Sequence, residues 1–253
     1  DEQANVRALD ATPVATIGLS ALPRDTATVT ISLALSDAEG KTLSRYRREV
    51  FLRAWQPPRY EIQPPARALI PKLTQAAGGN PAKVDWSKAA ALAGWRRVQG
   101  GPSPHAIEAR LAHDGRHLYV RLAQSGIAGE LQSDDGIWTG EDWELFFAGQ
   151  RGTPYRQLGV NPKGGTLEVV SDATLPLCGA KAASEVARGC WTVLVSLPLA
   201  TLVPGGLKSG SVFYGNLYRQ TGCGDTYREV IAWSPNYTGT CHMPERFGEF
   251  TLE

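Results

Sequence analysis

A stretch between residues 133 and 149 (SDDGIWTGEDWELFFAG) combines carboxylates, an aromatic ring and a hydrophobic strand. The carboxylates around Trp138 are Asp134, Asp135, Glu141 and Asp142. Carboxylate oxygens are the ligands that Ca²⁺ prefers, and an aromatic ring offers a flat apolar face to a sugar or another planar group. The stretch therefore predicts a structural calcium site, a ligand-facing ring at Trp138, or both. Solvated charges around a packed tryptophan are the alternative.

Enzymatic chemistry has little support in this sequence. A carboxylate pair for glycoside cleavage could be drawn from the same stretch, with Glu144 included, but such pairs need a deep cleft. The sequence has no GxSxG motif, phosphate loop or dinucleotide fingerprint. Its four histidines lack zinc spacing, and His113 and His117 flank an expected turn as surface residues. We therefore expect a non-enzyme, with a glycoside-active domain as the least favoured alternative.

The composition of the chain argues against a nucleic-acid partner and against a membrane span. The chain has 253 residues, 42% of them hydrophobic and 20% charged, with a formal net charge of +1. Nucleic-acid-binding proteins usually carry a basic excess, so no nucleic-acid partner is expected. No apolar run approaches the ~18 residues of a membrane span. The sequence starts at Asp1 without the pattern of a signal peptide, as expected of a mature secreted chain or of a piece of a longer one.

All four cysteines lie in the last third of the chain: Cys178, Cys190, Cys223 and Cys241. Three disulfide pairings are open, and the sequence does not decide between them. Local pairing would close two loops, 178 with 190 and 223 with 241. A zinc site is the rival, but no CxxC spacing supports it. Disulfides and an oxidising compartment (secreted, periplasmic or cell surface) are therefore predicted.

Residues 1–55 predict a small β segment. The alternating apolar positions are Val29, Ile31, Leu33 and Leu35, and they precede a hairpin turn at 37–41. A few strands seldom stand alone. The segment therefore either packs on the rest of the chain or is the remnant of an immunoglobulin-like domain. Residues 56–65 are proline-rich and are interpreted as a stiff linker.

Residues 66–253 predict an all-β fold. Residues 66–101 are irregular apart from a short helical turn capped by Asp85. Period-two patterns then recur between turn signals, with a short helix at 199–202. The predicted strands are 106–113, 117–122, 143–147, 155–161, 166–170, 191–198, 212–219, 229–233 and 247–252. Many short strands without a long helix indicate an antiparallel β-sandwich of jelly-roll type. Packing positions are assigned to Trp86, Trp143, Trp191 and Trp233.

Several motifs follow one another in a recognisable order. They are residues 114–122 (DGRHLYVRL), 138–147 (WTGEDWELFF), 155–164 (YRQLGVNPKG), 214–219 (YGNLYR), and 232–235 (AWSP) with 244–250 (PERFGEF). In this order the chain resembles a family 9 carbohydrate-binding module of the DOMON-like superfamily, over roughly residues 66–253. The resemblance implies a β-sandwich that clamps a saccharide between two tryptophan rings, with charged and amide side chains and structural calcium nearby.

Carried over by position, the resemblance assigns one clamp ring to Trp138 and polar ligands to Glu144 and the 216–219 strand. The predicted ligand-binding residues are Trp138, Glu144, Asn216, Arg219, Tyr237 and His242. Two positions depart from the family: the second clamp tryptophan falls on Cys241, and an arginine falls on Gly159. Tyr237 or His242 would then complete a one-sided platform.

The sequence therefore predicts a secreted or cell-surface, non-catalytic carbohydrate-binding module, with an upstream catalytic or immunoglobulin-like domain as a partner. The alternative is a structural, interdomain module that has kept the fold and lost the sugar site.

Overall fold

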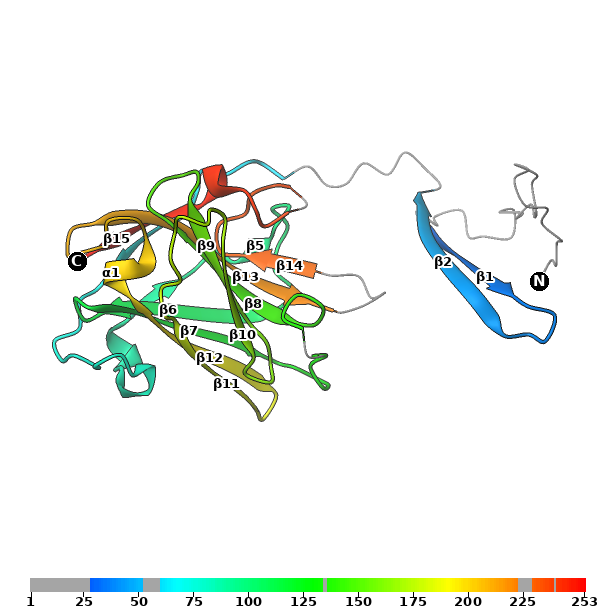
Figure 1. The fold of residues 1–253 in the computed structure, drawn as a ribbon, viewed down its shortest axis with the longest axis horizontal. Helices are drawn as coiled ribbons and strands as arrows, with labels where there is room; N and C mark the ends of the chain where they lie inside the picture. The colour runs from blue at the N-terminus through cyan, green and yellow to red at the C-terminus, as the bar shows by residue number, and fades with distance from the viewer. Residues whose placement is uncertain (1–27, 52–59, 134–135, 223–228, 239) are drawn as a thin grey trace. The chain divides into compact units, whose positions relative to one another are not determined.

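The computed structural model describes residues 28–51, 60–133, 136–222, 229–238 and 240–253 (Figure 1). The chain divides into two compact units, Asp1–Arg59 and Tyr60–Glu253. Its described part has no helix with the length and apolar character required to cross a membrane.

The first unit contains a β-hairpin, in which β1 (Thr28–Ser36) pairs antiparallel with β2 (Thr42–Phe51). In the turn, the backbone N–H of Lys41 donates to the carboxylate of Asp37 at 2.7 Å. Gly40 takes a φ of +82°, which glycine adopts without steric cost. The predicted hairpin and its turn are confirmed.

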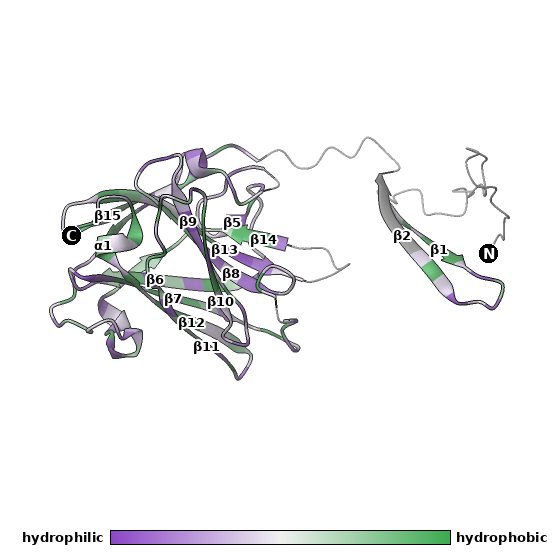
Figure 2. Ribbon diagram, viewed as in Figure 1, coloured by the Kyte–Doolittle hydropathy of each residue, from purple (hydrophilic) through white to green (hydrophobic). Residues whose placement is uncertain are grey.

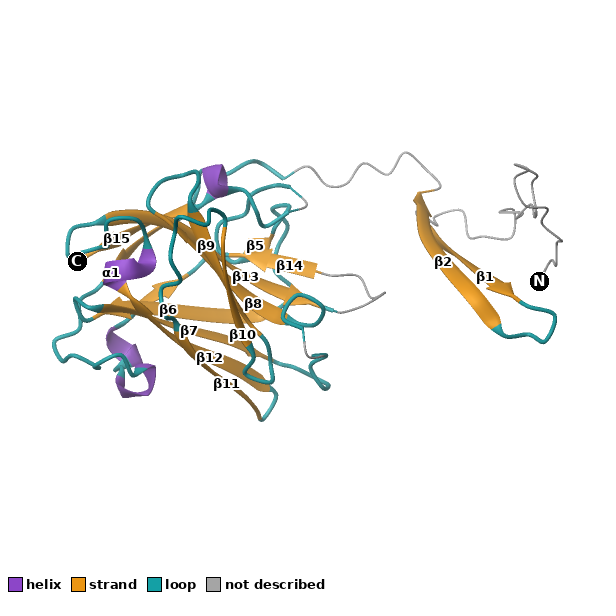
Figure 3. Cartoon of the chain, viewed as in Figure 1, coloured by secondary structure: helices purple, strands orange, loops and turns teal. Residues whose placement is uncertain are grey.

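The second unit is a β-sandwich of two sheets (Figure 3). The larger sheet contains β3 (Arg67–Ile70), β5 (Arg96–Arg97), β8 (Asp142–Ala148), β9 (Tyr155–Val160), β10 (Thr166–Val170), β13 (Val212–Thr221), β14 (Glu229–Ala232) and β15 (Gly248–Leu252). The smaller sheet contains β4 (Ala90–Leu92), β6 (Ala106–His113), β7 (His117–Ser125), β11 (Lys181–Ala187) and β12 (Cys190–Pro198). The predicted all-β sandwich is confirmed.

The strand order brings distant segments together. The larger sheet runs β10-β9-β8-β13-β14-β5, and β15 joins β13 to β3 at the side. The smaller sheet runs β11-β12-β7-β6-β4. Neighbouring strands are antiparallel except for β15 and β3. The short helix α1 (Leu199–Leu202) follows β12, as predicted.

The hydrophobic core lies between the sheets, and β8 shows how the sequence builds it. All seven residues of β8 are buried. Side chains alternate along a strand, so Trp143, Leu145 and Phe147 join the inter-sheet core while Phe146 joins a second cluster on the opposite face. Figure 2 shows hydrophobic and hydrophilic residues interspersed along the strands. We call the face of the larger sheet that points away from the smaller sheet the outer face.

The tryptophans assigned to packing occupy two places. Trp143 and Trp191 are completely buried in the inter-sheet core with ring centroids 6.0 Å apart, and Trp233 is 3% exposed and stacks on Phe250. Trp86 is half-buried and packs beside Tyr119 in a separate small cluster. The prediction that these rings are structural is confirmed.

The stretch 66–101 is more regular than its sequence indicates. It holds β3, β4 and β5 together with the 3₁₀ turns η1 (Pro81–Lys83) and η2 (Trp86–Lys88). Strands of two to four residues are too short to show a period-two pattern. The predicted cap is confirmed, because the carboxylate of Asp85 accepts from the backbone N–H of Ser87 at 3.1 Å.

Residues 60–65, part of the predicted linker, belong to the second unit. The backbone N–H of Gln63 donates to the hydroxyl of Tyr237 at 2.8 Å, and the guanidinium of Arg246 donates to the Gln63 carbonyl at 2.6 Å. These bonds hold this segment against the sandwich.

His113 was predicted at the surface and is wholly buried at the end of β6. Its Nδ1 accepts from the backbone N–H of Gly115 at 3.2 Å, so the ring closes the β6–β7 turn from within. Desolvation lowers its pKa below the ordinary value, and this favours the neutral ring. The hairpin turn was predicted correctly, and the position of its histidine was not.

Cys178 and Cys190, one of the local pairings left open by the sequence, do not form a disulfide, since both are free thiols. Cys178 is buried beside Glu168, and burial raises its pKa to about 11, which keeps the thiol protonated. Cys190 lies at the start of β12, with its sulfur 3.7 Å from the hydroxyl of Thr192. Cys223, the partner of Cys241 in the local pairing, lies outside the described residues.

Candidate functional site

The outer face of the larger sheet gathers polar side chains at its centre. Strand register places Glu144 of β8 between Gly159 of β9 and Tyr218 of β13. One step along, Phe146 lies between Gln157 and Asn216. Alternation therefore places two acidic side chains of β8 on this face: Asp142, which is completely buried, and Glu144, which has amide and aromatic neighbours.

The carboxylate of Glu144 is held by two carboxamides. Nε2 of Gln157 donates to one oxygen at 3.0 Å, and Nε2 of Gln220 donates to the other. The three side chains are 3%, 7% and 8% exposed in the same order. Hydrogen bonds to both oxygens offset part of the cost of burying the charge and fix the orientation of the carboxylate. The triad Gln157–Glu144–Gln220 thus forms a rigid polar floor.

Trp138 lies directly beside this floor. A Cβ atom added to Gly159 would lie 2.5 Å from ring atoms Cζ3 and Cη2 of Trp138. Cγ2 of Ile137 would lie closer still, so the Trp138 ring and Ile137 together occupy the space that any side chain at Gly159 would need, next to the paired Glu144. Trp138 is half-buried, so one part of the indole packs on the sheet and another part reaches solvent.

An aromatic cluster flanks the polar floor on the side where β9 begins, at Tyr155. Phe146 packs edge-on against His242, with ring centroids 5.4 Å apart. A hydrogen bond of 2.9 Å joins the Tyr155 hydroxyl and Nδ1 of the exposed His242. Burial, followed by the charge of Glu245, raises the pKa of Tyr155, so its hydroxyl remains protonated at neutral pH. His242 therefore lies at the rim of the outer face, and its part in a sugar platform stays a prediction.

Asn216 is also on the outer face but is fully occupied by the chain. It is completely buried; Nδ2 donates to the Ser234 carbonyl at 2.6 Å and to the Tyr218 hydroxyl at 2.8 Å. Its Oδ1 accepts from the backbone N–H of Ser234 at 2.9 Å. The Tyr218 hydroxyl in turn donates to the carbonyl of Cys241 at 3.1 Å. Asn216 therefore fixes the segment after β14 rather than presenting an amide to solvent.

Arg219 points to the other side of the sheet. Its guanidinium carbon lies 4.7 Å from the ring centroid of Trp191, inside the sandwich, and the residue is completely buried. Strand alternation explains the difference, because position 219 shares the inward face of Leu217. Arg219 is therefore separated from Glu144 by the sheet itself.

Tyr237 lies away from the polar floor as well. It is a non-glycine residue with positive φ (+63°), and its ring packs against Gly100. Arg246 covers the ring at 5.3 Å, and the hydroxyl accepts from Gln63. Tyr237 thus anchors residues 60–63.

Two of the four predicted calcium ligands, Glu141 and Asp142, lie within the described residues. Asp134 and Asp135 lie outside the described residues. Glu141 forms an ion pair with Arg219, and Asp142 is completely buried. Within the described residues, no three His, Cys, Asp or Glu side chains cluster as a metal site would require.

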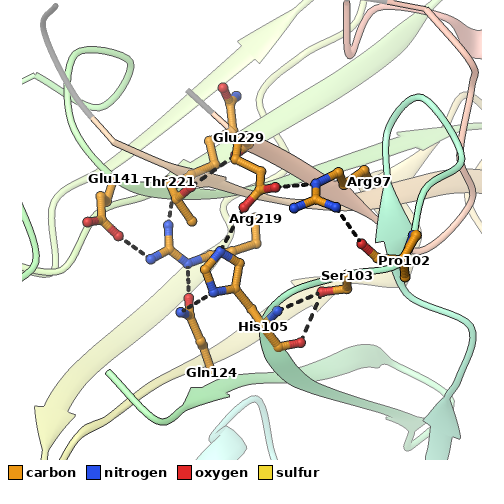
Figure 4. Close-up of polar contacts among 10 residues, drawn as sticks. Arg97, Pro102, Ser103, His105, Gln124, Glu141, Arg219, Thr221 and Glu229 are labelled. Carbon is orange, nitrogen blue, oxygen red and sulfur yellow. Dashed lines mark hydrogen bonds and ion pairs between the residues drawn. The ribbon is translucent and has the colours of Figure 1, made fainter. Parts of the chain in front are cut away.

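A second polar cluster lies at one end of the sandwich (Figure 4). Nε of Arg219 donates to Oε1 of Gln124 at 2.6 Å, and Gln124 approaches Nδ1 of His105 at 3.4 Å. Nε2 of His105 then donates to Glu229 at 3.1 Å, and Glu229 pairs with Arg97. Because Gln124 belongs to β7 and Arg219 to β13, this chain of contacts ties the two sheets together.

A cavity of about 220 Å³ borders this end cluster. Its lining includes His105, Gln124, Ile127, Leu131, Glu141 and Thr221. Glu141 is paired with Arg219 and His105 with Glu229, so we assign the end cluster to inter-sheet stability.

Sequence reasoning missed Gln157 and Gln220, which hold Glu144. A usable signal was present for Gln157, which lies in the 155–164 motif two residues before Gly159 and so shares its face. Gln220 lies one residue beyond the 214–219 motif, on the same face as Asn216 and Tyr218. Neither position could be linked to Glu144 without knowing that β8 lies between β9 and β13.

The fold is shared with solved carbohydrate-binding proteins. A family 9 carbohydrate-binding module from Caldicellulosiruptor kristjanssonii in complex with cellotriose matches with a TM-score of 0.57 at 14% identity, over 74% of this chain and 93% of that chain. A family 9 module from the same organism in complex with glucose matches with a TM-score of 0.55 at 14% identity, over 74% and 95%.

A protein from Bacteroides uniformis ATCC 8492, provisionally named as carbohydrate-binding, matches with a TM-score of 0.55 at 16% identity, over 75% of this chain and all of that chain. No protein-family model and no curated protein sequence matches the chain. The predicted resemblance to family 9 modules is therefore confirmed at the level of the fold.

Proposed function

We propose that the sandwich is a non-catalytic carbohydrate-binding module that holds a sugar on the outer face of its larger sheet. The observation that carries the proposal is the fixed Gln157–Glu144–Gln220 floor beside the half-exposed ring of Trp138. Two of the structurally similar modules are complexes with cellotriose and with glucose, which supports the same ligand class here.

The chemistry of the floor suits a sugar. Carboxylate and carboxamide groups accept and donate hydrogen bonds, as sugar hydroxyls require. The indole supplies an apolar surface for the C–H face of the ring. Because two carboxamides orient the carboxylate beforehand, less side-chain freedom is lost on binding.

Binding is favoured over hydrolysis by the same contacts. Glycoside cleavage needs a second carboxyl group several ångströms from the first. Asp142, the other carboxyl group on this face of β8, is completely buried, and two carboxamides hold both oxygens of Glu144. We therefore place the chain as an accessory module, acting where polysaccharide is found: secreted, periplasmic or on the cell surface.

Isothermal titration with glucose and cellotriose tests the proposal. The wild type is expected to bind at least one of them, and Trp138→Ala is expected to weaken binding. Trp86→Ala is the matched control, because that half-buried ring packs beside Tyr119 in a different cluster. Absence of binding by the folded wild type to these sugars and to a glycan array would overturn the proposal.

A structural, interdomain role is the second candidate. It is favoured by Gly159 and Cys241, which replace side chains that the resemblance places at the sugar, and by the packing of Trp138 onto Gly159. Under this role, no sugar binds, and Trp138 of a full-length protein is shielded from iodide quenching by another domain.

Calcium is proposed separately. If Asp134 and Asp135 hold a cation together with Glu141 or Asp142, the ion stabilises the native state by mass action. Excess chelator should then lower the melting temperature, and added Ca²⁺ should restore it. An unchanged melting curve would remove the site.

A further inference from the structure

Two aliphatic side chains extend the outer face beyond Trp138. Leu167 and Val169 belong to β10, the edge strand of the larger sheet. Leu167 is paired with Gly159, the residue under the Trp138 ring, and Val169 is paired with Gln157 of the polar floor. Paired residues of adjacent strands lie about 5 Å apart, so both side chains border the candidate site.

The orientation of β10 follows from its intervening residue. Glu168 forms an ion pair with Arg156. Arg156 is completely buried on the inward side of the sheet, where its guanidinium donates to the carbonyls of Thr201 and Leu202. Leu167 and Val169 flank Glu168 and therefore point to the outer face. They remain 42% and 40% exposed. We call this pair the apolar shelf.

The chemistry of the shelf differs from that of the tryptophan. Aliphatic side chains have no π face, so they lack the stacking that favours a bare sugar ring. They stabilise a contact by burying apolar area, and hydroxyl groups placed against them lose hydrogen bonds to water without replacement. An occupant of the shelf should therefore be apolar and uncharged.

We infer that the apolar shelf takes an apolar substituent, an alkyl, aryl or acyl group, carried by a sugar that is held at the Gln157–Glu144–Gln220 floor. This inference rests on the proposed function, because the register of β10 with β9 links the shelf to that sugar. The module thereby prefers a substituted saccharide over the same saccharide with a small polar end.

The test compares two glucosides by isothermal titration. Methyl β-glucoside reports the floor, and 4-nitrophenyl β-glucoside adds an aryl group that can reach the shelf. The wild type should bind the aryl glucoside about fivefold more tightly, as expected from partial burial of one ring. In Leu167→Thr/Val169→Thr, the two affinities should become equal while the affinity for methyl β-glucoside stays unchanged.

Threonine keeps the β propensity of the edge strand, and a melting curve verifies that the variant is folded. Val186→Thr is the matched control, since Val186 is 47% exposed on β11, the edge strand of the other sheet. It should retain the fivefold preference. Equal affinities in the wild type, or a preference that survives in the double variant, overturn the shelf alone. Failure of the folded wild type to bind either glucoside overturns the shelf, and failure to bind any sugar of the glycan array as well overturns the proposed function.

Discussion

The indole of Trp138 rests on Gly159, so closely that a Cβ atom at position 159 would lie 2.5 Å from the ring. These two positions are where the resemblance to family 9 modules expects a clamp ring and an arginine. The chain has the ring without the arginine, and the space freed by glycine is filled by the ring together with the side chain of Ile137. Trp138 can therefore pack onto the sheet and be half-buried because residue 159 has no side chain.

Substitution of Gly159 by alanine should displace Trp138. Gly159 has no positive φ, so the effect arises from the close approach and not from backbone strain. We expect a red shift in tryptophan emission as the ring moves toward water, and about a fivefold loss of sugar affinity from weakened aromatic contact.

Gly129→Ala is the control for this substitution, because a Cβ at Gly129 meets nothing within 4 Å. Its emission spectrum and affinity should match the wild type. A Gly159→Ala protein that also matches the wild type in both measurements would show that the contact does not position the ring.

Asn216→Ala should act on stability. The variant leaves the backbone N–H and C=O of Ser234 without their side-chain partner in a buried place, which costs about 3 kcal/mol. Urea denaturation measures the loss. Asn216→Asp, which keeps the acceptor and loses the donors, should recover only part of it. Unchanged stability with weakened sugar binding would instead support the ligand role that the sequence predicts for Asn216.

Much of the sandwich was predictable because most of its strands are long enough to show the period-two alternation of apolar residues. The 106–113 and 166–170 strands were predicted with the bounds that β6 and β10 have in the structure. The edge strand β11 was missed: Lys181–Ala187 is mostly exposed, small and polar, and lacks an apolar alternation. Tertiary pairing with β12 determines its conformation.

The candidate site contains two residues that the sequence predicts, Trp138 and Glu144, and their role in binding stays a prediction. The acidic and aromatic stretch led to Trp138 and Glu144, which lie side by side on the outer face. The orientation of Arg219 was within reach of the sequence, since period two places it with Leu217. The partners of Glu144 depend on strand order, which periodicity does not encode.

Acidification should destabilise the sandwich through His113. Desolvation, the largest cause, and the charge of Lys72 lower its pKa, while Glu253 and Asp114 favour the charged form. The unfolded chain then binds a proton at a higher pH than the folded one. The contribution of His113 to stability is therefore full above its unfolded pKa and is lost as pH falls through the lower folded pKa.

Urea midpoints between pH 7.5 and 5 measure this dependence, and His113→Gln should flatten it. His242→Gln is the control, because His242 is exposed at the rim. A pH dependence that is the same in His113→Gln and in the wild type would contradict the assignment.

Glu141→Ala should strongly destabilise the fold. Glu141 pairs with Arg219, whose side chain is completely buried, and removal of the carboxylate leaves that buried charge without its ion-pair partner. The expected loss is about 3 kcal/mol in urea denaturation. Glu130→Ala, at an exposed residue that lines the same cavity, should change stability by less than about 0.5 kcal/mol. Equal effects of the two variants would exclude the end cluster as an inter-sheet tie.

Side-chain amide signals test the location of the sugar most directly. In ¹⁵N-labelled protein titrated with cellotriose, the NH₂ signals of Gln157 and Gln220 and the indole N–H of Trp138 should shift together. The NH₂ signal of Gln124, which lies in the end cluster between Arg219 and His105, should stay in place. Shifts confined to Gln124, or none at Gln157 and Gln220 when cellotriose is bound, would contradict a sugar site on the outer face.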